Sequence, residues 1–258
     1  MHALKLASVP SFQDIGGYET VDGRTVRSGR LFRSGHFGRL SPVDRKQLDD
    51  AGIRLVIDLR GARDIVRDGH YLLPSGAQRL HLSAFDDSRK IDQSQRQLIK
   101  ADMKMHRAAL RKGDGERLMI AALMRLAFDR TKVFQALLSF LAEDRCLPAI
   151  VHCSAGKDRT GWAATLLLLA LGVPETEVLA HYLSSNEYRR DEVRSSLAKM
   201  SPHVDTEAML PLLEVRPQYL IATFHAIRQR FGSLDDYLTR AIDLDAERRR
   251  RLQANFLE

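Results

Sequence analysis

Short apolar runs, each bounded by turn residues, mark the strands of a predicted sheet. One runs from Ile53 to Leu59, a second lies within "AQRLHLSAF" (77–85), and a third lies within "LPAIVHC" (147–153). The stretch "SPVDRKQLDDAG" predicts a short helix with Ser41 as its N-cap and Gly52 just past its end. Strands and helices in this order are typical of an α/β sheet.

Helical periodicity dominates most of the remaining chain. From about residue 93 to 143 the pattern is helical and charged, with a break at Gly113–Gly115. The polar sequence before the break suggests a mobile insertion, whereas the apolar sequence after it predicts helices that lie on the body of the protein. Everything after Val173 is helical by pattern, including a helix that Ser233 caps with Asp236 three residues on.

These elements predict one domain over residues 1–258, since the chain is long enough for one large core and has no low-complexity linker. We expect a central, mainly parallel sheet flanked by helices and a helical C-terminal layer. We also expect a helical insertion at about 88–130 to act as a lid.

The charge of the chain bears on which ligands it could bind and not on its fold. The net charge is +7, so phosphates, anionic lipid and nucleic acid are candidate ligands. Four arginines, Arg248–Arg251, would spread around a helix and pair with Asp245 and Glu247. We expect no nucleic-acid partner, because no basic aromatic strand or helix-turn-helix pattern accompanies them. An anionic membrane surface remains a candidate for transient contact.

Two cysteines do not make a disulfide framework, which fits a reducing compartment. The sequence has no apolar run of membrane-spanning length and no signal-peptide core at its start. A cytoplasmic location is therefore the default expectation, although the sequence does not exclude unconventional export. Cys146 is expected to be a half-buried packing residue.

The stretch "AIVHCSAGKDRTGWAATLLLLALG" carries the chemistry. A strand delivers Cys153 to a loop, and a long apolar helix, closed by Gly172, follows it. Gly156 allows the loop to curl, so that its amides and the helix N-terminus form a cradle for an oxyanion. Cys153 in such a site is expected to be a thiolate, and the fork of Arg159 matches two phosphate oxygens. This arrangement predicts phosphoryl transfer through a phosphocysteine, without a metal or a cofactor. The predicted phosphate-binding residues are Ser154, Ala155, Gly156, Lys157, Asp158, Arg159 and Thr160.

The block "HCSAGKDRTG" resembles the signature loop of the cysteine-dependent protein tyrosine phosphatases. "FQDIGGY" (12–18), "RLFRSGHFGRLS" (30–41), "IDLRGARDI" (57–65) and "HYLSSNEY" (181–188) are similar to blocks of the bacterial tyrosine/lipid phosphatase family. The resemblance implies the cysteine-dependent phosphatase fold, with Cys153 as nucleophile and Arg159 as phosphate clamp. It also implies that Thr160 donates to the cysteine sulfur and that His152 orders the loop. Phosphotyrosine is the implied substrate, with phosphoserine, phosphothreonine and phosphoinositides as further candidates.

Lys157 and Asp158 depart from ordinary tyrosine phosphatases. A lysine beside the cradle would add charge for substrates with several phosphates, unless it is only a solvated loop cation. Asp158 is either a salt-bridge strut or a catalytic acid/base. For the general acid that protonates the leaving group, we expect Asp87 first, then Asp158, then Asp86. Alternatively, Asp86 and Asp87 form a solvated turn.

Two other functions compete with the phosphatase hypothesis. One is a non-catalytic phosphate-binding module, which the presence of Cys153, Arg159 and Thr160 disfavours. The other is a sulfur transferase or arsenate reductase with a similar loop. Arg60 and Arg63 either help to shape the pocket or form surface ion pairs.

Overall fold

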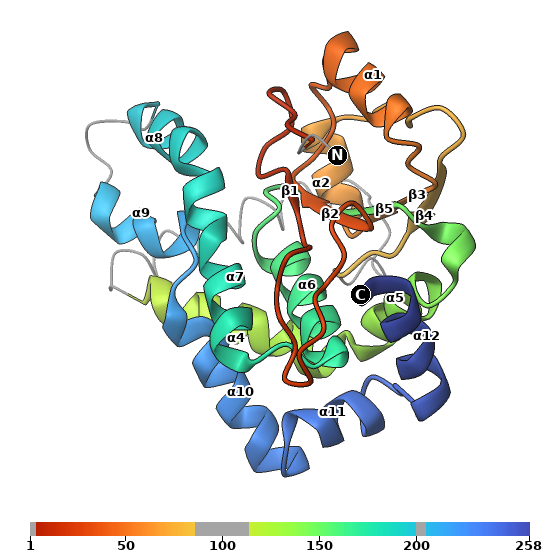
Figure 1. Cartoon of the computed structure of the whole chain (residues 1–258). Helices are drawn as coiled ribbons and strands as arrows, with labels where there is room; N and C mark the ends of the chain where they lie inside the picture. Colours follow the sequence, from red (N-terminus) through yellow and green to blue (C-terminus); the bar gives the residue numbers. More distant parts are fainter. Residues whose placement is uncertain (1–3, 86–113, 200–204) are drawn as a thin grey trace.

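A five-stranded sheet with helices on both faces forms the centre of the protein (Figure 1). The structure is a computed structural model that describes residues 4–85, 114–199 and 205–258. The strands are β1 (Gln13–Asp14), β2 (Leu31–Ser34), β3 (Leu55–Asp58), β4 (Gln78–His81) and β5 (Ala149–His152). Their order is β1-β2-β5-β3-β4, and only β1 runs antiparallel to its neighbour. The predicted α/β class and mainly parallel sheet are confirmed.

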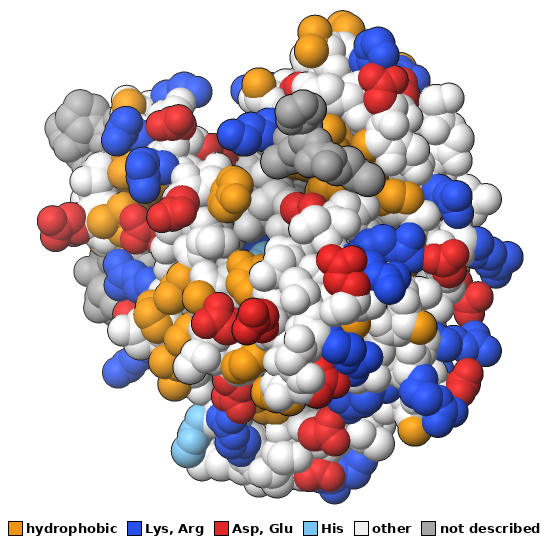
Figure 2. Space-filling model, in the orientation of Figure 1, with side chains coloured by type: hydrophobic (Ala, Val, Ile, Leu, Met, Phe, Trp, Pro, Cys, Tyr) orange, Lys and Arg blue, Asp and Glu red, His pale blue; other side chains and the backbone are white. Residues whose placement is uncertain are grey.

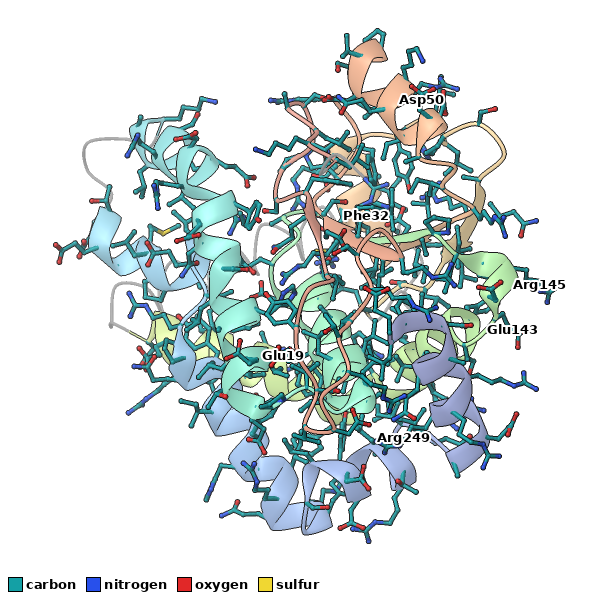
Figure 3. All side chains as sticks on the ribbon, viewed as in Figure 1. Glu19, Phe32, Asp50, Glu143, Arg145 and Arg249 are labelled. Atoms are coloured by element: carbon teal, nitrogen blue, oxygen red, sulfur yellow. The ribbon has the colours of Figure 1, made fainter. Side chains whose placement is uncertain are left out.

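Alternate strand residues face two different hydrophobic clusters. Phe32, Val56 and Ile150 point to the smaller cluster, under α1 (Pro42–Asp50). Their neighbours, such as Ile57 and Val151, point to the larger cluster on the opposite face. Figure 3 labels Phe32 on β2, where its side chain is buried. Because both faces are covered, the central strands are apolar almost throughout, as in other parallel sheets.

The helix α6 (Asp158–Leu171) is the axis of the larger layer. It contacts β2 and β5, and other helices surround it, so that nearly every one of its side chains is buried. The remaining described helices are α2 (Ala62–Asp68), α4 (Gly115–Asp129), α5 (Thr131–Leu141), the short 3-10 helix η1 (Asp144–Cys146), α7 (Glu175–Tyr188), α8 (Arg190–Ala198), α9 (Thr206–Leu213), α10 (Pro217–Phe231), α11 (Leu234–Arg240) and α12 (Ala246–Phe256). The prediction of a helical chain after Val173 is therefore confirmed for the described residues.

Several predicted boundaries are confirmed by cap geometry. The hydroxyl of Ser41 accepts from the Asp44 amide at 3.1 Å, and that of Ser233 accepts from the Asp236 amide at 2.9 Å. Gly172 ends α6 with a φ of 89°. The strands are shorter than their apolar runs, since β3 covers only Leu55–Asp58 within the run 53–59.

The predicted insertion at 88–130 is only partly within the described residues. Its last part forms α4, which packs on α6, α9 and α10 and buries Leu123 and Leu126. This part therefore belongs to the core, as its apolar pattern predicts. Residues 86–113 lie outside the described residues, and the lid remains a prediction.

The arginines of α12 pair with neighbouring acids. Arg250 and Arg251 pair with Glu247, and Arg249 pairs with Asp235. Figure 2 shows the resulting mixture of positive and negative side chains on the side of the molecule that carries α12. Among the helices of the described ranges, none has the length and apolar character needed to cross a membrane.

Candidate active site

The candidate site lies at the carboxyl edge of the sheet. The last residues of three parallel strands meet there in register, because His152 of β5 lies opposite both Ser34 of β2 and Asp58 of β3. The loop that follows β5 carries Cys153, which is 2% exposed, and α6 begins at Asp158. Ligand sites of open parallel sheets lie at this edge.

The carbonyl groups of the loop are held from outside. Donors from the N-terminal segment, from β2 and the residues just after it, and from the residues that flank the loop reach every carbonyl from residue 153 to 157. The pairs are His152 Nδ1 with Cys153 O (3.2 Å), His36 N with Ser154 O (2.9 Å), Ser11 Oγ with Ala155 O (3.2 Å), Arg33 Nη2 with Gly156 O (2.8 Å) and Gly161 N with Lys157 O (2.7 Å).

The loop amides consequently face inward. In a trans peptide the N–H points away from the preceding carbonyl, so anchoring the carbonyls outside turns the next amides toward the centre of the loop. Within the described ranges, none of the amides of residues 155–159 donates to a protein group. These amides lie at the N-terminus of α6, which favours a bound anion. This geometry supports the oxyanion cradle, which stays a prediction.

Gly156 is required by both conformation and space. Its φ is +66°, and a Cβ there would lie 2.6 Å from the amide nitrogen of Gly35 and from the carbonyl carbon of Ser34. Ser11, whose hydroxyl holds the preceding carbonyl, also has a positive φ of 54°. Such a conformation costs energy in a non-glycine residue and persists where the surroundings impose it.

Arg159 is oriented by a carboxylate from α2. Its Nη1 donates to Asp64 Oδ2 at 2.5 Å, and its guanidinium lies 4.5 Å from the centre of the Phe85 ring. Asp64 also accepts from the amide of Gly61 at the start of α2. Burial raises the pKa of Asp64, but the positive charges of Arg159 and Arg67 outweigh it and hold this pKa below its ordinary value. Asp64 is thus an anion that positions the predicted phosphate clamp.

These observations agree with the sequence comparisons. Residues 4–258 match the sequence model described as the tyrosine phosphatase family. The chain belongs to this family. A Cupriavidus necator protein named "Putative tyrosine-protein phosphatase" is 33% identical over 254 residues, which cover 95% of this chain and 85% of that protein. "Triple specificity protein phosphatase PtpB" of Mycobacterium tuberculosis is 30% identical over 271 residues, with coverages of 92% and 93%.

His152 lies under the loop of this tyrosine phosphatase family member as a neutral ring. Its Nε2 lies 2.6 Å from Tyr71 Oη, and its Nδ1 faces the Cys153 carbonyl. Burial lowers the pKa of His152 to about 4, although Asp58 acts in the opposite direction. A neutral ring with its proton on Nδ1 can donate to Cys153 O and accept from Tyr71. This geometry fits the predicted ordering role.

Asp58 joins a buried ion-pair network beneath His152. Its carboxylate accepts from Arg60 at two atoms, each at 3.0 Å, and from Arg79 at 2.5 Å. Arg60 is 0% exposed, so the alternative of a surface ion pair is wrong for this residue. Burial raises the pKa of Asp58, but the bonds from Arg60 and the nearby His152 lower it well below its ordinary value.

Lys157 is not a solvated cation, because it is only 3% exposed. Its Nζ donates to Leu212 O at 2.5 Å, in the last turn of α9, and to Glu214 O at 3.2 Å, just after that helix. Asp158 Oδ2 lies 3.5 Å from the same ammonium group, as expected of a salt-bridge strut. The ammonium group therefore binds backbone carbonyls of a distant segment, because burial leaves it no water to bind.

The remaining predicted residues have different outcomes. Thr160 Oγ1 is buried and has no hydrogen-bond partner among the described residues, so the predicted bond to the cysteine sulfur is not formed. Ser154 and Ala155 lie in the loop as predicted. Asp86 and Asp87 lie outside the described residues, and the choice of general acid stays a prediction. Cys146 is half-buried against the core, as expected.

Sequence reasoning assigned no role to Asp64, Tyr71, Ser11 or Arg33. Three of them lie in or beside blocks that resemble the family, so the signal was present without a function attached to it.

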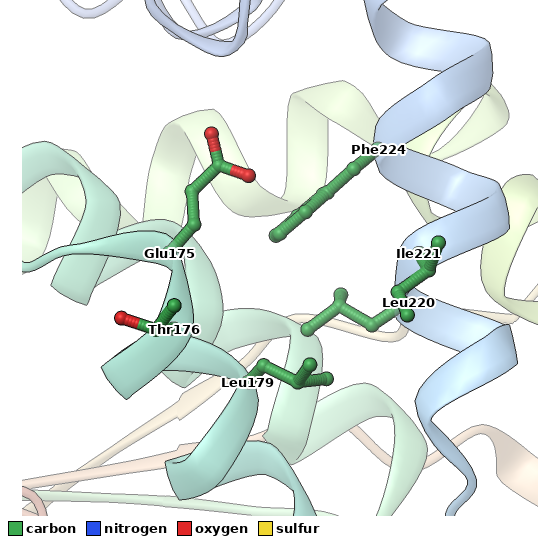
Figure 4. Close-up of a pocket in the computed structure, with 6 residues that line it drawn as sticks. All are labelled: Glu175, Thr176, Leu179, Leu220, Ile221 and Phe224. Atoms are coloured by element: carbon green, nitrogen blue, oxygen red, sulfur yellow. The ribbon is translucent and has the colours of Figure 1, made fainter.

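A further apolar pocket of about 180 Å³ lies between α7 and α10, away from the loop (Figure 4). Leu179, Leu220 and Phe224 point into it.

Proposed function

We propose that this chain hydrolyses phosphomonoesters through a phosphocysteine on Cys153. One observation carries the proposal: a loop whose carbonyls are anchored outside surrounds a buried cysteine with inward-facing amides, beside an arginine that a carboxylate holds in place. These parts provide a nucleophile, a cradle for the equatorial phosphoryl oxygens and a positioned cation.

The reaction has two balanced steps. The thiolate of Cys153 attacks phosphorus, the bond from phosphorus to the ester oxygen breaks, and the leaving oxygen takes a proton from a general acid. Water then attacks the phosphocysteine, the P–S bond breaks, and inorganic phosphate leaves. Asp87 is our first candidate for the acid, followed by Asp158 and Asp86. The amides of the loop and Arg159 stabilise the charge on the phosphoryl oxygens in both steps.

Phosphotyrosine is the first substrate class that we propose, with phosphoserine and phosphothreonine as further classes. The word "triple" in the name of the Mycobacterium tuberculosis relative supports broad specificity. Phosphoinositides are a further proposed class, supported by the family resemblance and by the net charge of +7. That charge also supports transient contact with an anionic membrane surface.

Steady-state turnover of a small aryl phosphate tests the proposal. We expect vanadate-sensitive turnover, loss of turnover in Cys153→Ser, and retained binding of inorganic phosphate by that variant. A chain that binds phosphate without turnover would be a binding module. Turnover of thiosulfate or arsenate without phosphoester hydrolysis would support the sulfur transferase or arsenate reductase. A panel of phosphotyrosine peptides and phosphoinositide vesicles, at matched protein concentration, then ranks the substrate classes.

A further inference from the structure

A fully buried guanidinium lies behind the loop without a carboxylate partner. Arg33, on β2, is 0% exposed, and within the described ranges no carboxylate forms an ion pair with it. Arg60 is equally buried, but it is compensated by two bonds to Asp58. Burying a cation without such compensation is costly, so the position of Arg33 calls for a function.

The contacts of Arg33 on one side are with the catalytic loop. Its Nη2 donates to Gly156 O at 2.8 Å and lies 3.4 Å from Lys157 O. These two carbonyls belong to the peptide units whose N–H groups come from Lys157 and Asp158. A donor fixed behind the carbonyls therefore fixes the direction of those two amides as well.

The contacts on the other side hold the guanidinium to α7. Nη2 also donates to Ser185 Oγ at 2.9 Å, and Nη1 lies 3.2 Å from His181 Nε2. Arginine only donates, so His181 presents a lone pair at Nε2 and carries its proton on Nδ1, 3.0 Å from Tyr18 Oη. Burial and the charge of Arg33 lower the pKa of His181 well below its ordinary value, which keeps the ring a neutral acceptor.

We propose that Arg33 is a positioning residue that aims the amides of Lys157 and Asp158 at the phosphoryl oxygens, while its buried charge, with which no described carboxylate forms an ion pair, strengthens the attraction for an anion in the loop. This inference rests on the proposed function of the loop. On this proposal, β2 and α7 also help to orient the amides that would bind the phosphoryl group.

Arg33 remains charged in this environment. Burial lowers the pKa of Arg33 to about 10, although Cys153 and the nearby tyrosine hydroxyls act in the opposite direction. The guanidinium is therefore protonated at neutral pH. The titratable and charged groups that face it come from four places, namely Cys153 in the loop, Asp158 at the start of α6, His181 and Tyr182 on α7, and Tyr18 from the N-terminal segment.

Space for the guanidinium depends on Gly161. A Cβ at this position would lie 3.2 Å from Arg33 Nη2 and from the ring of Tyr182. Gly161→Ala should therefore press on the guanidinium, whereas alanine raises the intrinsic stability of α6. This substitution gives a second perturbation of Arg33 that does not remove a buried charge.

The test is tungstate binding measured by calorimetry in the Cys153→Ser background, so that no turnover is needed. We expect Arg33→Met to weaken tungstate binding by about tenfold or more, the scale of a lost charge-assisted contact. Arg33→Lys, which keeps the charge and one donor direction, should recover part of the affinity. Thr223→Ala is the matched control, since it removes a fully buried side-chain hydrogen bond within α10 that involves neither Arg33 nor the loop, and it should change the affinity by no more than about twofold.

Wild-type affinity in folded Arg33→Met would overturn the proposal, as would an equal loss in Thr223→Ala. If Arg33→Met does not fold, Gly161→Ala decides: weaker tungstate binding at unchanged or higher Tm supports the proposal, and unchanged binding overturns it. Failure of the proposed function would look different, because wild-type protein would then lack Cys153-dependent turnover whatever the variants of Arg33 do.

Discussion

Replacing Asp64 by asparagine should leave Arg159 in the site but remove the carboxylate that holds it in position. The carboxylate accepts from Arg159 at 2.5 Å and from Arg67 at 2.9 Å, and the side chains of Asp64 and Arg159 are only 9% and 12% exposed. Asparagine keeps the shape of the side chain but removes its charge. Arg159 would then be a nearly buried cation without a fixed anion beside it.

The cost can be estimated from burial. Removing one partner of a fully buried ion pair costs about 3–5 kcal/mol, and the remaining exposure of both groups reduces this to about 2–3 kcal/mol. At about 2–4 °C per kcal/mol for a chain of this size, Tm should fall by roughly 5–10 °C. Loss of one charge-assisted hydrogen bond, about 1.5–3 kcal/mol, should lower kcat/KM by about 10- to 100-fold.

The effect should also depend on pH. The pKa of Asp64 is lower in the folded chain than in the unfolded one, so its contribution to stability is complete above about pH 4 and is lost as pH falls through the folded value. Wild type and Asp64→Asn should therefore differ most in Tm at neutral pH and converge in acid. Inorganic phosphate should raise the Tm of the variant more than that of wild type, because it supplies the missing anion.

Calorimetric unfolding with and without phosphate, together with aryl phosphate kinetics, measures these effects. Asp68→Asn is the matched control: it lies on the same helix, pairs with Arg67 at 2.8 Å, and is similarly buried, but it does not contact Arg159. Its Tm should fall while kcat/KM stays near wild type. Wild-type kcat/KM in Asp64→Asn, or an equal kinetic loss in both variants, would refute the reasoning.

Three further predictions follow from the same geometry. His152→Asn should flatten the pH dependence of the free energy of unfolding between about pH 4 and 6.5. Wild type loses stability on acidification in this range, because His152 binds a proton only in the unfolded chain. Chemical denaturation that shows the same pH dependence in the variant and in wild type would contradict this. Gly156→Ala should lower kcat/KM at least about 100-fold, whereas Gly23→Ala, at a positive φ in open space, should affect only stability; equal kinetic effects would refute the steric argument. Lys157→Met should speed hydrogen exchange at residues 212–216 by freeing two carbonyls, and unchanged exchange by mass spectrometry would show that this tether is not rigidifying.

The fold was largely predictable because its signals are local. Apolar runs, the caps at Ser41 and Ser233 and the glycine that ends α6 depend on neighbours within a few residues. The loop after β5 was predictable for the same reason, since the cysteine, the glycine and the arginine lie within seven consecutive positions.

The supporting residues were not predictable because they meet only through sheet register. Arg33 and Asp64 are separated from the loop by about a hundred residues, and an arginine or aspartate in isolation is expected at the surface. Only the pairing of β2, β5 and β3 brings the ends of these strands together. An arginine inside an apolar strand, as in "RLFRSG", is the one local signal that could have indicated a buried cation.

Lys157 shows how three-dimensional context changes the meaning of a residue. A lysine inside a phosphate loop suggests direct contact with a second phosphate, but this lysine already donates to two carbonyls at the C-terminal end of α9. To bind a substrate, the ammonium group would have to break its hydrogen bonds to these carbonyls, and no water could replace it there. The free energy lost would weaken substrate binding. Its charge nevertheless stays next to the loop. We therefore expect Lys157→Met to reduce kcat/KM for phosphotyrosine peptides and phosphoinositides by similar factors, and a selective loss on phosphoinositides would show that the ammonium group moves to the substrate.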